Sequence, residues 1–118
     1  MKKEVLGFLE DILRYAKVAH EIVDLTTSEK LCEEYSFQGL ALERTLEIIG
    51  EAVKNVPLEA RELRPEIPWK QIAGLRDILI HRYWSAQIAR VVFIVKEDLP
   101  KLENAVKEIL EHYQNPKT

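Results

Sequence analysis

The sequence predicts an all-α protein, an up-and-down bundle of four main helices that forms a single domain over residues 1–118. Apolar residues recur at intervals of three and four along nearly the whole chain, and no segment alternates apolar and polar residues as a half-buried strand does. Capping residues and prolines divide this pattern into segments of helix length. A chain of 118 residues can bury one hydrophobic core but is too short for two.

The first helix is predicted over about residues 3–25. One apolar stripe runs along it, formed by Val5, Phe8, Ile12, Tyr15, Ala19 and Ile22. The run Thr26-Thr27-Ser28-Glu29 that follows is typical of a capping box, in which a hydroxyl and a carboxylate satisfy free amides of the next helix.

That next helix is predicted over about residues 28–56. Its apolar seam predicts a nearly antiparallel neighbour and consists of Tyr35, Gly39, Leu42, Leu46, Ile49, Val53 and Val56. Gly39 and Gly50 would each cost about 1 kcal/mol inside a helix. Close approach of another helix would explain them, and so would a break near Ser36-Phe37; both possibilities stay open.

Prolines at positions 57, 65 and 68 indicate a connecting stretch, with a short helical turn at residues 58–62. Pro68 suits the first position of a third helix, where its missing amide costs nothing. We expect this helix to run from Trp69 to about Tyr83. It has little polar surface, because its apolar residues include Ile72, Leu75, Ile78, Leu79 and Ile80, so we expect it to be buried at the centre of the bundle.

The last element is expected to begin at a Ser85 cap. Its apolar residues keep the spacing of four and three through Pro100: Ile88, Val92, Val95, Leu99, Leu102, Val106, Ile109 and Tyr113. This pattern predicts one long helix kinked at Pro100, or two helices split there that share a face.

Charge and composition exclude several classes of protein. The net charge of −3 argues against a protein that coats nucleic acid without specificity. Residues 61–96, however, carry seven basic and three acidic side chains, a net +4 that suits a phosphate backbone, unless it is simply an uneven solvated surface. No apolar run is long enough to span a bilayer, no signal peptide is visible and there is one cysteine, so we expect a cytoplasmic protein.

Metal and cofactor sites are not expected. His20 and His112 lie on separate predicted helices without ligand spacing, and Cys32 is interpreted as a small apolar residue. The chain has no glycine-rich phosphate loop.

The third helix carries the polar residues that point to chemistry. Arg76, Asp77 and His81 interrupt a run of isoleucine and leucine, and burying such groups without partners is costly. Either they pair internally for structure, or they line a cleft or a subunit interface. Asp77 and His81 are four residues apart, with Lys70 on the same side, so Asp77 can bond one imidazole nitrogen and leave the other free for proton transfer.

Arg76 and Tyr83 are seven residues apart and project together, whereas Arg76 and His81 lie about 140° apart on a straight helix. The arginine and the histidine therefore cannot grip one phosphate from an intact, isolated helix. Two arrangements solve this problem: the helix ends near Ile80, or a second subunit supplies one of the two groups.

The segment Arg76-Asp77-Ile78-Leu79-Ile80-His81-Arg82-Tyr83 resembles the R-x4-H-x-Y signature of the HepT-like proteins, a branch of the HEPN superfamily. The preceding run Trp69–Leu75 and the segment Ile48–Ala52 are also similar to that family, and the likeness covers essentially the whole chain.

This resemblance implies a metal-independent endoribonuclease that is the toxin of a toxin–antitoxin pair. It implies a homodimer with catalytic Arg76 and His81 in a shared cleft, no cofactor, and an MntA-type nucleotidyltransferase antitoxin that transfers AMP to Tyr83. RNA supplies its own 2′-hydroxyl nucleophile, so a histidine acid or base and an arginine suffice, and a 2′,3′-cyclic phosphate product is expected. The alternative is a non-catalytic helical module that docks a nucleotidyltransferase, with Arg76, Asp77 and His81 as an ion-pair network.

Several residues around the motif have two interpretations. Glu51, like Asp77, is a candidate supporting residue that orients Arg76 or His81, or else an exposed or structurally paired carboxylate. Lys70 and Arg82 are candidate RNA contacts, although position 82 varies in the family and is often acidic. A solvated face is favoured over RNA binding for Arg61, Arg64 and also Lys70. Core or interface packing is favoured over base stacking for Trp69 and Trp84.

Overall fold

A computed structural model describes residues 3–33, 36–75 and 84–114 of the chain, and within these ranges every regular element is a helix. The elements are α1 (Lys3–Asp24), α2 (Ser28–Cys32), α3 (Phe37–Lys54), α4 (Leu58–Arg61), α5 (Trp69–Ala73), α7 (Trp84–Phe93), the π-helical segment η2 (Ile94–Asp98) and α8 (Leu99–Gln114). The predicted all-α class is confirmed.

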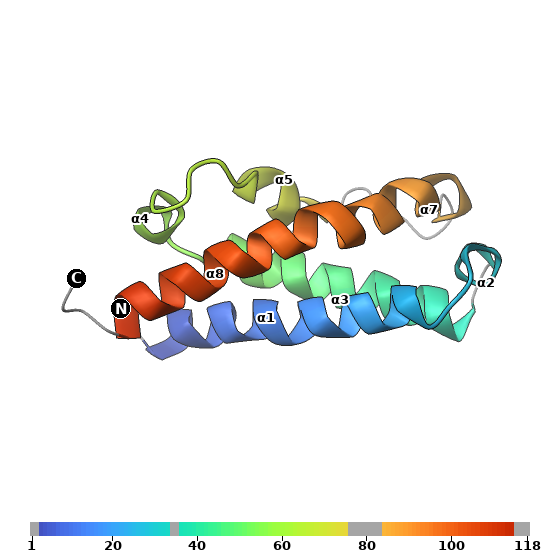
Figure 1. Cartoon of the computed structure of the whole chain (residues 1–118), viewed down its shortest axis with the longest axis horizontal. Coiled ribbons are helices and arrows are strands. Elements are labelled where there is room, and N and C mark those ends of the chain that lie inside the picture. Colours follow the sequence, from blue (N-terminus) through green and yellow to red (C-terminus); the bar gives the residue numbers. More distant parts are fainter. Residues whose placement is uncertain (1–2, 34–35, 76–83, 115–118) are drawn as a thin grey trace.

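Within the described ranges three long rods form the bundle, which measures 49 × 24 × 23 Å (Figure 1). The helix α1 packs along α3 and against η2 and α8, and it runs antiparallel to both α3 and the rod formed by α7, η2 and α8. The short α5 lies across α3, while α2 closes one end of the bundle and contacts α3 and α7. In the part of the chain that the structure describes, no helix is long and apolar enough to cross a bilayer.

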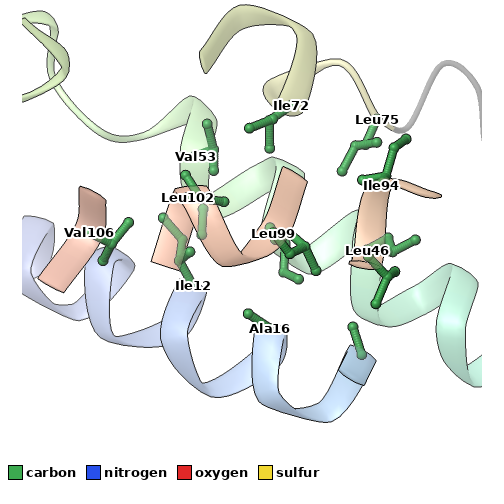
Figure 2. Close-up of a cluster of buried hydrophobic side chains, with 14 of the residues drawn as sticks. Ile12, Ala16, Leu46, Val53, Ile72, Leu75, Ile94, Leu99, Leu102 and Val106 are labelled. Carbon is green, nitrogen blue, oxygen red and sulfur yellow. The ribbon is translucent and has the colours of Figure 1, made fainter. Parts of the chain in front are cut away.

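Aliphatic side chains from all of the long rods and from α5 form one core (Figure 2). Ile12 and Ala16 of α1, Leu46 and Val53 of α3, and Leu99 and Leu102 of α8 point into the same interior, and each of these side chains is fully buried. Ile72 and Leu75 cover this core from the α5 side. The residues beside the predicted motif are therefore held by the central packing of the protein.

The predicted helix 28–56 is two helices, which confirms the alternative of a break near Ser36-Phe37. The Thr27 hydroxyl accepts a hydrogen bond from the Lys30 amide at 3.1 Å and caps α2, one residue later than a cap on Thr26 would lie. The Ser36 hydroxyl accepts from the Gly39 amide at 3.0 Å and caps α3. Gly39 therefore lies in the first turn of α3, where it does not interrupt a continuous helix.

The predicted helix 69–83 is interrupted at Gly74. Helix α5 ends at Ala73, and the Gly74 amide bonds to the carbonyls of Lys70 and Gln71 in a turn. Glycine has low helix propensity, which favours an ending there. Pro68 is the N-cap of α5, one position earlier than predicted, while the predicted turn at 58–62 is confirmed as α4.

The last rod is distorted near Pro100, as predicted. The distortion lies in η2, in the turn before the proline. In η2 the Leu99 amide bonds to the Ile94 carbonyl, five residues earlier. Pro100 has no amide hydrogen and its ring would clash with the carbonyl four residues back, so the preceding turn widens. Ser85 does not cap this rod, because α7 already includes Trp84.

Candidate functional site

The predicted motif residues Arg76, Asp77, His81, Arg82 and Tyr83 lie outside the described residues. The described chain stops at Leu75 and resumes at Trp84, so the structure places both flanks of the motif. On the upstream flank Leu75 is only 3% exposed and packs in the core. On the downstream flank α7 begins the rod that continues into α8.

The upstream flank is fixed by a close approach between two backbones. A Cβ atom on Gly50 of α3 would lie 3.1 Å from the Ile72 carbonyl oxygen and 3.4 Å from that of Ala73. This confirms close helix approach as the reason for Gly50. Trp69, 6% exposed, anchors the other end of α5 by donating its indole N–H to the Arg64 carbonyl at 2.9 Å. Core packing, the favoured role of Trp69, is confirmed.

A cavity of about 190 Å³ opens beside Leu75, between α5 and the rod of α7 and η2. Its apolar wall includes Ile72, Leu75 and Ile94. Its polar and aromatic lining consists of Gln71, Arg90, Phe93 and Asp98. The cavity therefore joins a cation, an amide, a carboxylate and an aromatic ring directly beside the upstream flank of the motif.

Glu51 and Lys70, the two predicted site residues that the structure describes, are both exposed and line different cavities. Glu51 opens into a groove of about 400 Å³ between α1 and α3, which also contains Asp11, Arg44 and Glu47. Lys70 borders an apolar hollow of about 520 Å³ near α4 and α5. For Glu51, the alternative of an exposed carboxylate agrees with this position.

Arg61 has a structural role, where the sequence favoured a solvated face. Its guanidinium donates to the carbonyls of Val56 at 2.9 Å, Val53 at 2.9 Å and Lys54 at 3.2 Å, at the C-terminal end of α3. The last carbonyls of a helix lack the regular amide partners of its interior; that of Val53 also accepts the Val56 amide at 3.0 Å. A cation at this end complements the negative end of the helix dipole.

Arg64 is neutralised by two carboxylates. Its guanidinium lies 2.6 Å from a Glu66 oxygen and 2.5 Å from a Glu108 oxygen, and the hydrogen bond from Arg64 lowers the pKa of Glu66. Arg64 is thus a paired residue, where the sequence favoured a solvated face, and this pairing leaves it little capacity to bind a phosphate.

We predict that Arg61→Ala destabilises the fold by about 2 kcal/mol, because it leaves three carbonyls without a charged donor. Chemical denaturation followed by circular dichroism measures this loss. The matched control is Arg14→Ala, an exposed arginine on α1, for which we expect a change below about 0.5 kcal/mol. Equal stability of the two variants would show that the Arg61 bonds contribute nothing to the fold.

His20 connects two of the rods. Its Nε2 lies 2.6 Å from Oε1 of Glu103, so the pair ties α1 to α8 across the bundle. Cys32 packs against the core as a partly buried apolar residue, as predicted. Among the described side chains, no group of three or more histidine, cysteine, aspartate and glutamate residues is placed to hold a metal ion.

Comparison with known proteins decides the family. The family model described as Ribonuclease HepT-like matches residues 12–109, which include the whole predicted motif. The chain belongs to the HepT-like ribonuclease family. The resemblance inferred from Arg76, His81 and Tyr83 is therefore confirmed at the level of the family, and the family places this helical bundle among ribonucleases.

Curated relatives agree with the HepT-like assignment. A Thermococcus cleftensis protein named "Probable ribonuclease HepT" is 36% identical over 110 residues, which cover 92% of this chain and 98% of the relative. A Methanocaldococcus jannaschii protein, named for gamma-glutamylcyclotransferase and an inferred RNase, is 37% identical over 120 residues. That match covers 99% of this chain, which spans only 52% of the relative's length. No solved structure matches the chain.

Four residues that line the cavity beside Leu75 were not predicted from the sequence as site residues, namely Gln71, Arg90, Phe93 and Asp98. The positive charge of residues 61–96 includes Arg90, and an arginine three residues before a phenylalanine on a predicted helix was the available signal.

Proposed function

We propose that this HepT-like chain is a metal-independent endoribonuclease, the toxin of a toxin–antitoxin pair, with Arg76 and His81 as its catalytic residues. The observation that carries the proposal is the match to a ribonuclease family over residues 12–109, within which Arg76 and His81 have the R-x4-H spacing. The RNase names of the relatives agree with this chemistry.

The proposed reaction uses the substrate's own nucleophile. The 2′-oxygen of a ribose attacks the adjacent phosphorus and the bond from phosphorus to the 5′-oxygen breaks, which leaves a 2′,3′-cyclic phosphate and a 5′-hydroxyl. The His81 imidazole takes the proton of the 2′-hydroxyl or delivers one to the leaving 5′-oxygen. Arg76 neutralises the charge that develops on the phosphorane oxygens. Asp77 holds His81 in one tautomer.

The active form in this proposal is a homodimer. On a straight helix Arg76 and His81 point about 140° apart, so one phosphodiester contacts both groups most simply when two copies of the motif face each other across a two-fold axis. Lys70, which is exposed at the start of α5, and Arg82 are the proposed contacts to the flanking phosphates.

Silencing is proposed to act through Tyr83. An MntA-type nucleotidyltransferase partner would transfer AMP to the Tyr83 hydroxyl, with pyrophosphate leaving from ATP. The adduct adds bulk and negative charge close to Arg76, and it would obstruct the cleft and repel the RNA phosphate. The acidic side chains of residues 1–60, twelve against seven basic ones, offer a surface for a basic partner.

Incubation of the purified chain, without the nucleotidyltransferase, with total RNA in EDTA tests the proposal. We expect cleavage to persist in EDTA, because no step needs a metal ion, and we expect fragments that end in a 2′,3′-cyclic phosphate. Phosphatase sensitivity and mass spectrometry of the fragments identify these ends.

The Arg76→Ala chain, purified in the same way, controls for a contaminating nuclease. RNA that stays intact with the parent chain under all buffer conditions, together with tight binding to the nucleotidyltransferase, would instead support the non-catalytic docking module. Cleavage that stops in EDTA would contradict the metal-independent mechanism.

A further inference from the structure

We propose that the cavity between α5 and the rod of α7 and η2 is a nucleotide subsite, in which Phe93 stacks on a base of single-stranded RNA and Arg90 contacts a phosphate. This subsite rests on the proposed ribonuclease function, and its residues hold the RNA beside the bond that is cleaved. Arg90 and Phe93 lie on α7, downstream of the motif, and the cavity reaches Leu75, the residue before Arg76.

Phe93 provides the stacking surface. It is 58% exposed, although most large apolar side chains of this rod are buried in the core. An aromatic face in contact with water favours stacking of any base, because every base presents a π-face. The cavity volume of about 190 Å³ is far above the roughly 10–15 Å³ that one water needs, so the space beside the ring is large enough for a group much bigger than water.

Arg90 provides the charge. It lies three residues before Phe93, so the two side chains leave the same face of α7. In the part of the chain that the structure describes, no carboxylate lies within ion-pair distance of Arg90, whereas Arg64 has two such partners. An exposed guanidinium beside an aromatic ring suits the phosphate that links stacked bases.

Gln71 and Asp98 add groups that read base edges. The Gln71 amide both donates and accepts, and the Asp98 carboxylate accepts from an exocyclic amino group. Adenine carries such an amino group and uracil does not. The polar lining therefore favours a nucleotide over a purely apolar partner segment, and adenine over uracil.

The test measures binding of fluorescein-labelled A12 and U12 RNA by fluorescence anisotropy. All variants carry His81→Ala, so that the RNA is not consumed. We expect Phe93→Ala to weaken A12 binding at least about fivefold, since stacking contributes about 1–3 kcal/mol per base. Phe93→Trp should keep the affinity within about twofold. Arg90→Gln should reduce the slope of log K against log[salt] by about 0.7, the loss of one phosphate contact.

The matched control is Phe37→Ala, because Phe37 is 88% exposed at the start of α3 and lines none of the three cavities described above. We expect it to leave A12 binding unchanged, and we expect Asp98→Asn to reduce the preference for A12 over U12. Equal A12 binding by Phe93→Ala and by the His81→Ala chain overturns the subsite.

Light scattering on the same samples distinguishes a nucleotide subsite from a contact between two copies of the chain. Loss of A12 binding together with a change in the mass of the Phe93→Ala assembly would show that this face joins two copies, and it would overturn the nucleotide subsite. RNA cleavage by the parent chain is measured separately. If the parent cuts RNA while Phe93→Ala binds A12 normally, only the subsite fails; if the parent never cuts RNA, the proposed function fails.

Discussion

His81→Ala should lower the rate of RNA cleavage by a factor between about 10² and 10⁴. Removing a general acid or base typically costs this much, because water must then carry the proton at a much lower effective concentration. The single-turnover rate on a defined RNA measures the loss. The far-ultraviolet circular dichroism spectrum should stay that of the parent, since the described core is built from residues up to Leu75 and after Trp84.

His112→Ala is the matched control for this experiment. His112 is an exposed histidine near the end of α8, and its removal should leave the cleavage rate within about twofold of the parent. A His81→Ala chain that cuts RNA as fast as His112→Ala would remove His81 from the mechanism, and with it the proposed use of the R-x4-H spacing.

The long helices were predictable because each buries one apolar face against the same core. The predicted seam of Leu42, Leu46, Ile49 and Val53 is fully buried, and α1 ends at Asp24, one residue from the predicted limit. The prediction for the last rod was also nearly right, except that Val91 is fully buried and Val92 only partly. The helical period of 3.6 residues does not depend on how the neighbouring helices are arranged, so it can be recognised in the sequence alone.

The ends of the short elements were harder to predict, because local chemistry allowed more than one outcome. Thr26 and Thr27 both offer a hydroxyl to an N-cap, and only the path of the chain selects Thr27. Ser36 caps α3, although the apolar spacing continues through this position and does not by itself mark the start of a helix. The widened turn η2 follows from Pro100, but the pattern does not state whether a proline kinks, splits or widens a helix.

For the site, the sequence predicts which residues carry chemistry but not which surface residues surround them. Arg61, Arg64 and Arg90 have the same side chain in one positively charged third of the chain. Only the structure separates them: Arg61 binds helix carbonyls, Arg64 is paired with two glutamates, and Arg90 lines the cavity beside Leu75. Arg61 reaches carbonyls five to eight residues away, which requires the chain to turn back after α3, while the pair of Arg64 with Glu108 and the cavity beside Arg90 join segments far apart in sequence. A periodic pattern in one sequence indicates neither the turn nor these contacts.

Gly50→Val should destabilise the protein by about 3 kcal/mol and lower its ribonuclease activity at the same time. The added Cβ would lie 3.1 Å from the Ile72 carbonyl oxygen, and a branched side chain extends further toward the same backbone. A backbone oxygen cannot rotate away as a side chain can, so α5 must move. Because Leu75 follows α5 closely, this movement displaces the start of the motif at Arg76. Urea denaturation and the cleavage rate measure the two effects.

Gly7→Val is the matched control, because a Cβ at Gly7 on α1 meets nothing within 4 Å. It replaces the same residue type inside a helix, where valine has a higher helix propensity than glycine, so we expect equal or slightly higher stability than the parent. The difference between the two variants isolates the contact of α3 with α5 from the general effect of removing a glycine. An unchanged free energy of unfolding in Gly50→Val would mean that α5 can move away from α3 at no cost. The position of Leu75 would then not depend on the contact between α3 and α5.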